Sequence, residues 1–164
     1  MNREILGRCI LCSDDRGAEY VEQVRDALGA EGFYRINPNI LSTSYTLPKL
    51  AWRRDNEPEL YRTAERFVLF DGLVGFMAGC EPFVSFSGAN RTLLFDVRAE
   101  GWSDRILEIA GLDRGKLPRC LPGGEVAGEV SSAAAASLGV PAGAKVVVGG
   151  HDQCCNALGA GIIE

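Results

Sequence analysis

The sequence lacks the long apolar run that a membrane-spanning helix requires. Such a helix takes about 20 consecutive apolar residues, and no run among these 164 residues approaches that length. The sequence also lacks a basic surplus, because its formal net charge is −5 at neutral pH. We therefore expect neither a membrane nor a nucleic acid as a partner. The polar residues 1–4 do not resemble the start of a secretory signal.

Histidine is nearly absent, since His151 is the only one, and the cysteines follow no regular pattern. Because no secretory signal accompanies them, we expect reduced thiols in a cytoplasmic protein. One alternative is a zinc site that combines Cys9-x-x-Cys12 with His151, Cys154 and Cys155. This alternative is weak, because alternate residues of a strand point to opposite faces and free cysteine is commonly buried. The six cysteines stand at positions 9, 12, 80, 120, 154 and 155.

What the sequence does contain is typical of a globular protein, with 46% hydrophobic and 24% charged residues. Strand-like and helix-like segments alternate, which predicts an α/β fold. The predicted helices exceed what the few short strands need, so part of the sheet is expected to lie outside the chain. Strands are expected at 8–12, 67–70, 125–130 and 146–148. Helices are expected at 15–28, from 46, from 56, at 71–77, over 104–109, at 131–138 and at 153–160, and irregular segments at 33–44, 81–90 and 117–124.

The C-terminal stretch holds the strongest candidate for chemistry. The β-branched run Val146–Val148 predicts a buried strand, and Gly149–Gly150 then allow a sharp turn or a close approach of the backbone to a ligand. Asp152 follows, just before a small, apolar segment that predicts a packed helix. Ligands bind at the carboxyl ends of strands in open α/β sheets, and a helix N-terminus favours an ionised carboxylate. Asp152 is therefore either a general base or only the cap of the helix.

Taken in order along the chain, a series of motifs resembles the FGGY carbohydrate kinases, and the xylulokinase-like members match best. The resemblance extends from about Gly7 to Gly161. It implies an actin-like, ribonuclease-H-like α/β fold in two domains, with sugar and ATP bound in the cleft between them. It also implies transfer of the γ-phosphoryl group of MgATP to a hydroxyl of a sugar or polyol. The motifs are Thr46–Trp52, Asn56–Glu59, Asn90–Asp96, Trp102–Asp104 and Gly149–Gln153.

The resemblance assigns roles to the residues of the last motif. Asp152 corresponds to the catalytic base, and a positioned carboxylate can take the proton of a weakly nucleophilic sugar hydroxyl. Gly149, Gly150 and His151 are expected to shape the loop of the base, although most xylulokinases have a third glycine in place of His151. Gln153 is expected to help shape this loop and to contact the substrate.

The resemblance also places a substrate segment near the N-terminus. The family has a Trp-x-Asp-x-Arg pattern where this sequence has Cys12, Asp14 and Arg16, so these three are expected at the substrate. Cys12 replaces a tryptophan that helps to line the sugar site in relatives, and this change should loosen or reshape the site. Val84–Ser85 replaces a Thr-Asp pair and removes a carboxylate. These departures leave the identity of the sugar open.

The helix that begins at Thr46 carries a basic face. Lys49, Arg53 and Arg54 form this face opposite the apolar residues of the helix. Charged helix faces usually lie in water, so we expect it to be solvated. The alternative is that it borders the sugar cleft.

The family pattern extends beyond both ends of this sequence. In the family a phosphate-binding hairpin precedes the part that this chain resembles, and an ATP-binding domain follows it. Residues 1–164 are therefore expected to be the latter part of an N-terminal sugar-binding domain, inactive alone, with ATP and Mg as cofactors of the complete enzyme. The expected partners are the missing kinase domain or, through exposed apolar surface, a second copy. The alternative is a non-catalytic sugar-binding or interaction remnant of a kinase.

Overall fold

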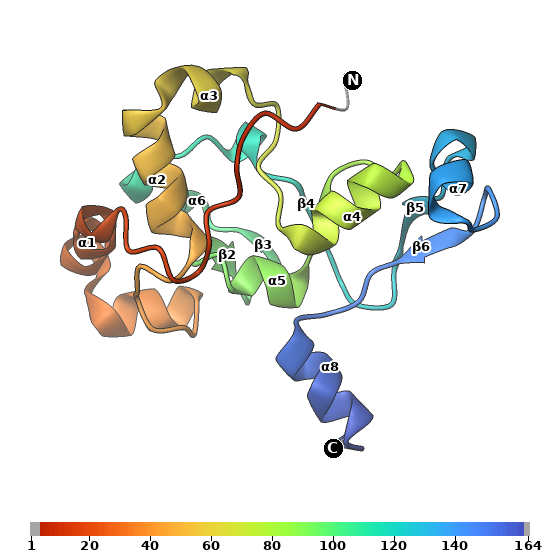
Figure 1. Ribbon diagram of the computed structural model, residues 1–164. Coiled ribbons are helices and arrows are strands. Elements are labelled where there is room, and N and C mark those ends of the chain that lie inside the picture. Colours follow the sequence, from red (N-terminus) through yellow and green to blue (C-terminus); the bar gives the residue numbers. More distant parts are fainter. Residues whose placement is uncertain (1–3, 163–164) are drawn as a thin grey trace. The chain divides into compact units, whose positions relative to one another are not determined.

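The computed structural model describes residues 4–162 and divides into two compact units. The helical unit comprises Glu4–Phe67 and Ala89–Leu117, and the strand unit comprises Val68–Gly88 and the chain from Pro118 onward. Figure 1 shows the elements of both in colours that follow the sequence. Within the described residues no helix combines the length and the apolar character that a membrane crossing requires. The polar residues 1–3 lie outside the described part of the chain.

The helical unit is built from helices whose ends carry clear local signals. α3 begins with Pro58, whose missing N–H is harmless in a first turn. Ser103 caps α6 by accepting a hydrogen bond from the amide of Ile106 at 3.4 Å, and Gly111 ends that helix with a φ of 62°. The elements of this unit are α1 (Ala18–Ile36), α2 (Thr46–Asn56), α3 (Pro58–Thr63), the antiparallel pair β2 (Phe95–Asp96) and β3 (Gly101–Trp102), α6 (Asp104–Ala110) and the 3-10 turn η1 (Arg114–Lys116).

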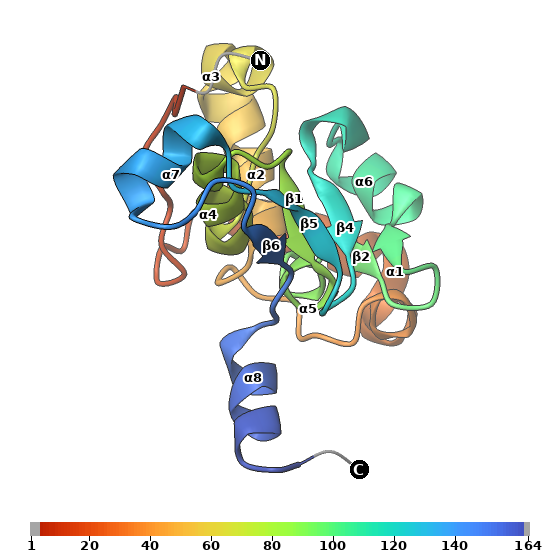
Figure 2. The ribbon, with the colours of Figure 1, turned by 90° about the vertical axis from the view of Figure 1, so that its right-hand side faces the viewer.

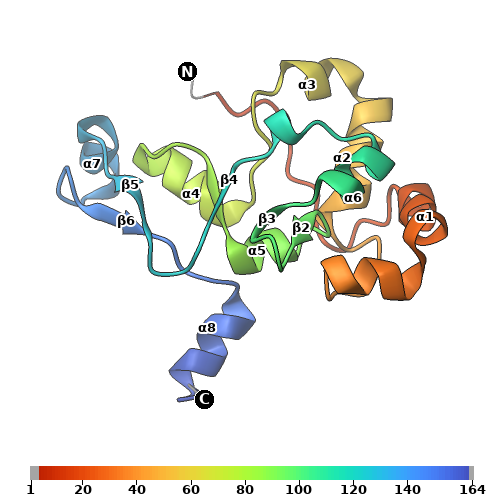
Figure 3. The same ribbon diagram turned by 180° about the vertical axis from the view of Figure 1, so that it is seen from behind.

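The core of the helical unit lies where α1 packs against α2 and α6, which Figure 3 shows side by side. A buried amide closes this core. Asn37 is fully buried, and its side-chain nitrogen donates to the carbonyl oxygens of Asn90 and Phe95, each at 3.0 Å. Since a buried amide must find partners, Asn37 ties the end of α1 to Asn90 and to the first residue of β2. The largest fully buried side chains of the unit include Phe33, Leu47, Leu93, Leu94 and Ile106.

The strand unit contains two short pairs of strands with helices around them. β1 pairs in parallel with β4, and β5 pairs antiparallel with β6, with a register irregularity between Val126 and Gly128. Figure 2 shows β1 beside β4. Its elements are α4 (Phe70–Ala78), β1 (Phe83–Ser85), the start of α5 (Phe86–Asn90), β4 (Arg119–Leu121), β5 (Val126–Glu129), α7 (Ser132–Leu138), β6 (Lys145–Val147) and α8 (Asp152–Gly159). Its core consists of Cys80, Phe83, Leu121, Ala127 and Val148.

Helix α4 packs closely on β1 because two of its residues have no side chain. A Cβ at Gly72 would come closer than 3.0 Å to the carbonyl oxygen of Phe83, and a Cβ at Gly75 would come as close to the Phe83 ring. The other face of α4 is apolar but open to solvent. Its exposed side chains are Phe70, Val74 and Met77, which are 66%, 66% and 61% exposed. Their spacing places them on one face of the helix, and we call them the α4 stripe.

The mixed α/β composition is as predicted, but two predicted strands are wrong. Residues 8–12 form no strand, because side chains rather than a neighbouring strand take their carbonyl groups. Arg53 Nη2 donates to the carbonyl oxygen of Arg8 at 2.7 Å, and Lys49 Nζ donates to that of Cys12 at 3.3 Å. The predicted strand at 67–70 is also absent, since Phe70 already begins α4.

Two segments predicted to be irregular contain regular structure. Residues 81–90 hold β1 and α5, and residues 117–124 hold β4. These strands have three residues each and pair with each other across the sequence, so neither has a local pattern long enough to predict. The first helical segment is interrupted at Gly29 as predicted, because the φ of 67° and ψ of 164° of this residue are not helical. A second helical segment, which was not predicted, then extends α1 to Ile36.

The predicted burial of the C-terminal elements is also wrong. β6 has a single partner strand, so Val147 is 54% exposed and only Val148, just after the strand, is buried. The predicted packed helix exists as α8, but none of its residues is buried. Figures 1 and 3 show α8 apart from the other elements of the strand unit.

Candidate active site

The stretch that carries Asp152 begins where β6 ends. Backbone hydrogen bonds of 2.8 Å join Val148 to Glu125 and to Gly124, so the pairing continues one residue beyond β6. Two glycines follow, then His151 at the N-cap position of α8, and then Asp152 as the first helical residue. Asp152 therefore stands between a strand end and a helix N-terminus, as predicted.

The carboxylate of Asp152 is open to solvent, and only one of its two oxygens has a polar contact. Its side chain is 74% exposed. Oδ1 accepts a hydrogen bond from the backbone amide of Gln153 at 2.9 Å and lies 3.1 Å from Nε2 of His151. Oδ2 makes no hydrogen bond with any residue from 4 to 162. Among the described residues, one oxygen of this carboxylate is therefore unbonded and open to a ligand.

Asp152 does not occupy the N-cap position of α8, so the alternative that it only caps the helix does not hold as stated. His151 holds the N-cap position, and its side chain makes no capping hydrogen bond. The glycines before it are not required by backbone conformation, because neither Gly149 nor Gly150 has a positive φ. A Cβ at Gly149 would meet nothing within 4 Å, whereas one at Gly150 would lie 3.4 Å from Ser87 Oγ. Gly149 therefore has open space beside its backbone, whereas Gly150 packs against Ser87.

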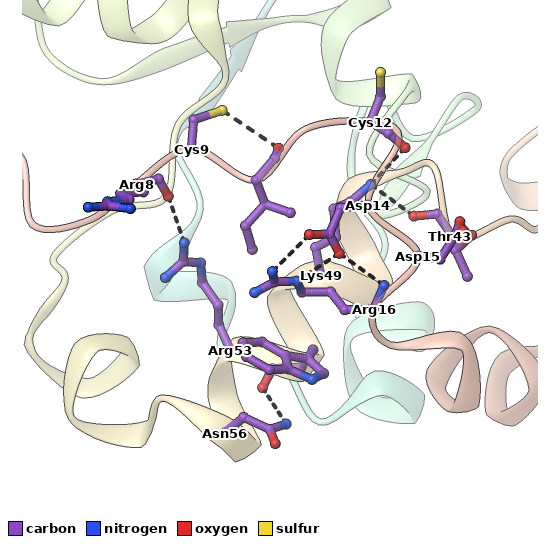
Figure 4. A network of polar contacts seen from close by, with 12 residues as sticks. Arg8, Cys9, Cys12, Asp14, Asp15, Arg16, Thr43, Lys49, Arg53 and Asn56 are labelled. Carbon is purple, nitrogen blue, oxygen red and sulfur yellow. Dashed lines mark hydrogen bonds and ion pairs between the residues drawn. The ribbon is translucent and has the colours of Figure 1, made fainter.

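The predicted substrate segment lies in the helical unit, where its charged residues bind each other. Nε and Nη2 of Arg16 each donate to one carboxylate oxygen of Asp14 at 2.8 Å, as Figure 4 shows. These hydrogen bonds hold the pKa of Asp14 below its usual range. The guanidinium of Arg16 also stacks on the ring of Trp52, 4.3 Å from its centroid. The pair therefore forms a fixed, neutral structure, and Cys12 beside it is exposed.

Lys49 holds the Cys12–Arg16 segment through hydrogen bonds of its ammonium group. The prediction that Lys49 is exposed to solvent is wrong. Lys49 is only 6% exposed. Its Nζ donates to the carbonyl oxygens of Cys12, at 3.3 Å, and of Thr43, at 2.9 Å (Figure 4). Burial lowers the pKa of this ammonium group, and the nearby charge of Asp14 opposes that shift. Lys49 is thus buried because its ammonium group donates to carbonyl groups of two other segments, although the local sequence pattern predicts that it is exposed to water.

The other two residues of the basic face are occupied as well. Arg53 pairs with Glu57, and Arg54 pairs with Asp55. Arg53 also borders an open pocket in the helical unit, of about 580 Å³. The residues that line this pocket are Arg8, Cys9, Ile10, Leu11, Ser13, Asp14, Arg16, Arg53 and Glu57. Asp14 and Arg16 of the predicted substrate segment therefore line the same pocket as Arg53.

The predicted site residues fall into two groups. Cys12, Asp14 and Arg16 belong to the helical unit, and the Gly149–Gln153 stretch belongs to the strand unit. The structure places each group within its own unit. The residues of the zinc alternative are also split between the units, because Cys9 and Cys12 belong to the helical unit and the others to the strand unit. Within residues 4–162 no three His, Cys, Asp or Glu side chains could together hold a metal ion.

Of two residues that touch these groups, Lys49 was singled out from the sequence only as part of a solvated face, because its burial depends on the carbonyl groups of Thr43 and Cys12. The other, Ser87, was not singled out. Ser87 accepts a hydrogen bond from the backbone amide of His151 at 2.8 Å. It follows the departure at Val84–Ser85, and no local pattern links it to a residue 64 positions later.

Comparison with known families decides the relationship of the chain. The family model for the FGGY family of carbohydrate kinases, N-terminal domain, matches residues 1–159. The chain belongs to this family. The resemblance inferred from the motifs is therefore confirmed over nearly the whole sequence.

Curated relatives within the family are sugar kinases by name. The chain is 30% identical over 155 residues to the xylulose kinase of Lactococcus lactis, covering 94% of this chain and 31% of that one. It is 28% identical over 146 residues to the L-fuculokinase of Escherichia coli, covering 89% of this chain and 31% of that one. The chain thus spans about a third of the length of the curated relatives it matches.

Solved structures confirm the predicted fold. Plasmodium falciparum glycerol kinase with ADP matches with a TM-score of 0.87 at 18% identity, over 99% of this chain and 33% of that one. At this identity the likeness concerns the fold alone. The chain therefore has part of the actin-like α/β fold of the sugar kinases.

Proposed function

We propose that this chain is the latter part of the sugar-binding domain of an ATP-dependent kinase that phosphorylates a hydroxyl of a sugar or polyol. Membership of the FGGY family supports the reaction class. The observation that carries the proposal is the carboxylate of Asp152, which has one unbonded oxygen at the N-terminus of α8. It stands at the position that the resemblance assigns to the catalytic base.

Asp152 would act on the acceptor side of the reaction. A sugar hydroxyl becomes a better nucleophile as a carboxylate takes its proton, and such base catalysis contributes about 10²–10⁴-fold. MgATP supplies the phosphoryl group and its metal ion. Between residues 4 and 162 no three acidic, histidine or cysteine residues form a metal cluster, and Mg²⁺ at a nucleotide is bound mainly by phosphate oxygens and one or two carboxylates. In this proposal MgATP is held by the two thirds of a family member that this chain does not span.

The Cys12–Arg16 segment would form part of the wall on which the sugar rests. The bidentate pair of Asp14 and Arg16 is held on Trp52 and on the lysine-bound loop, so it is already ordered before a ligand arrives. Such preorganisation lowers the entropic cost of binding. Cys12 leaves this wall smaller than a tryptophan would, and relatives named for two different sugars are similarly distant. The sugar is therefore proposed only by class.

The partner of this chain would be the remainder of the kinase. The α4 stripe gives it an apolar surface, and exposed apolar patches mark contact sites. When the chain is alone, the same stripe offers a route to self-association. Because ATP is the proposed phosphoryl donor, the cytoplasm is the location that we propose.

Two measurements test this function. The first is the flanking coding sequence, in which the proposal expects a phosphate-binding hairpin upstream and an ATP-binding domain downstream. The second is ADP release by the complete polypeptide with a panel of pentuloses, hexoses and polyols. If no such flanking domains exist, or if the complete polypeptide turns over none of these acceptors, the alternative of a non-catalytic remnant replaces the kinase.

A further inference from the structure

A single hydrogen bond ties the loop before Asp152 to a separate part of the strand unit. The backbone amide of His151 donates to Ser87 Oγ at 2.8 Å. Among the described residues, positions 149–152 make no other hydrogen bond outside β6 and α8. Gly150 also lies against the same hydroxyl, because a Cβ there would be 3.4 Å from Ser87 Oγ. The placement of this loop therefore depends on Ser87.

Ser87 is itself held in place by a short polar chain. Its hydroxyl lies 3.4 Å from the hydroxyl of Ser85. Ser85 is buried, and its backbone amide donates to Oδ2 of Asp71 at 3.0 Å. Asp71 stands in the first turn of α4, and its Oδ1 accepts a hydrogen bond from Gly72 at 2.8 Å. The chain of contacts thus runs from α4 through the end of β1 to the loop of Asp152.

The hydroxyl oxygens of Ser85 and Ser87 accept hydrogen bonds from different backbone amides. Ser85 Oγ accepts a hydrogen bond from the amide of Gly88 at 3.0 Å and so satisfies an early amide of α5. Ser87 makes no such bond to its own helix, and its oxygen accepts from His151 instead. Ser85 is therefore the residue that caps α5. The hydroxyl of Ser87 remains for the distant loop.

We propose that Ser87 is a positioning residue for Asp152. By holding the amide of His151, it sets where α8 begins and therefore where the carboxylate of the next residue points. This inference rests on the proposed function, because it gives Asp152 the part of the base. The imidazole of His151 is a direct reporter, since its Nε2 lies 3.1 Å from Asp152 Oδ1 and no other histidine is present.

The test uses this chain, with NMR measurement of amide exchange and of the His151 imidazole resonances at fixed pH. Ser87→Ala should raise the exchange rate of the His151 amide roughly two- to ten-fold, as expected for loss of one hydrogen bond. Amides of α7 should not change. Asp152→Asn removes the carboxylate that contacts the imidazole and serves as the reference. In Ser87→Ala the imidazole resonances should shift part of the way toward the positions measured in Asp152→Asn. Ser87→Thr keeps the hydroxyl and should restore both readouts.

Ser137→Ala, at an exposed site on α7, is the matched control and should alter neither readout. Unchanged exchange at His151 in Ser87→Ala would overturn the proposal. So would a uniform loss of protection throughout the strand unit, because the hydroxyl would then be only a general support. These outcomes are separate from kinase activity. If Asp152→Asn leaves turnover intact while Ser87→Ala still loosens the loop, the proposed function fails and the hydrogen bond stands.

Discussion

Lys49 Nζ lies 3.3 Å from the carbonyl oxygen of Cys12 and 2.9 Å from that of Thr43, so one buried ammonium group holds two loops together. Lys49→Met keeps the length of the side chain but removes both hydrogen bonds. We expect the segment around Cys12 to detach locally, because no strand pairing holds it. Trypsin cleavage after Arg16 should become about five-fold faster or more, as expected for loss of hydrogen bonds from a charged donor.

Lys145→Met is the control for this prediction. Lys145 pairs with Glu129 in the strand unit and touches neither loop, so its removal should leave cleavage after Arg16 unchanged. Equal cleavage rates in Lys49→Met and in the unmodified chain would show that the lysine is not what holds the segment.

The hydroxyl of Tyr20 donates a 2.7 Å hydrogen bond to Oδ2 of Asp55, and this bond contributes to a pKa shift of each group. The hydrogen bonds from Arg54 and then from Tyr20 lower the pKa of Asp55 from 3.8 to about 2. Burial, followed by the bond to Asp55, raises the pKa of Tyr20 from 10.0 to about 12. The shared bond therefore favours the ionised carboxylate and the neutral phenol.

The sign of each shift sets a pH window for stability. A lowered carboxyl pKa gives stability that is present above pH 3.8 and is lost as the pH falls toward 2. A raised phenol pKa gives stability that is present below pH 10 and is lost as the pH rises toward 12. Asp55→Asn should therefore flatten the fall in the thermal midpoint between pH 4 and pH 2. Asp26→Asn, at an exposed position of α1, should keep the fall seen in the unmodified chain.

Much of the fold could be predicted because its signals are local. Ser103 and Ser131 cap α6 and α7, and Gly79 and Gly139 end α4 and α7 with positive φ, so these helices lie near their expected ranges. The motif order predicted the family and the position of Asp152. What could not be predicted depends on distant partners. β1 is stabilised by a strand that follows it by more than 30 residues, and the burial of Lys49 depends on carbonyl groups of two separate loops.

The close packing of α4 on β1 predicts that Gly72→Ala is destabilising. The new methyl group would meet the carbonyl oxygen of Phe83, which is backbone and cannot turn aside. Overpacking of this kind costs about 1–3 kcal/mol, and urea unfolding should show that loss. Gly159→Ala in α8 is the control, because a Cβ there meets nothing within 4 Å, and it should be neutral or slightly stabilising. Equal stabilities for the two variants would contradict the packing.

The α4 stripe predicts that the isolated chain binds hydrophobic dyes and associates as its concentration rises. Val74 lies in the middle of the stripe and is 66% exposed, so Val74→Lys should reduce both signals without loss of stability. Ile40→Lys replaces an apolar residue that is 80% exposed and belongs to the helical unit, not to the stripe, and should change them little. A chain that stays monomeric and binds no dye would count against this surface.

The catalytic part proposed for Asp152 predicts a specific pattern of kinetic change in the complete polypeptide. Asn at this position keeps the size of the side chain and its hydrogen-bonding capacity but cannot take a proton at neutral pH. If Asp152 is the base, Asp152→Asn should lower kcat by about 10²-fold or more and leave sugar affinity nearly unchanged. If it only stabilises the first turn of α8, asparagine should serve almost as well. Asp104→Asn makes the same change at the first residue of α6, where the side chain is 84% exposed, and should leave kcat intact. A near-normal kcat for Asp152→Asn would remove this carboxylate from the reaction and leave it a structural role at the N-terminus of α8.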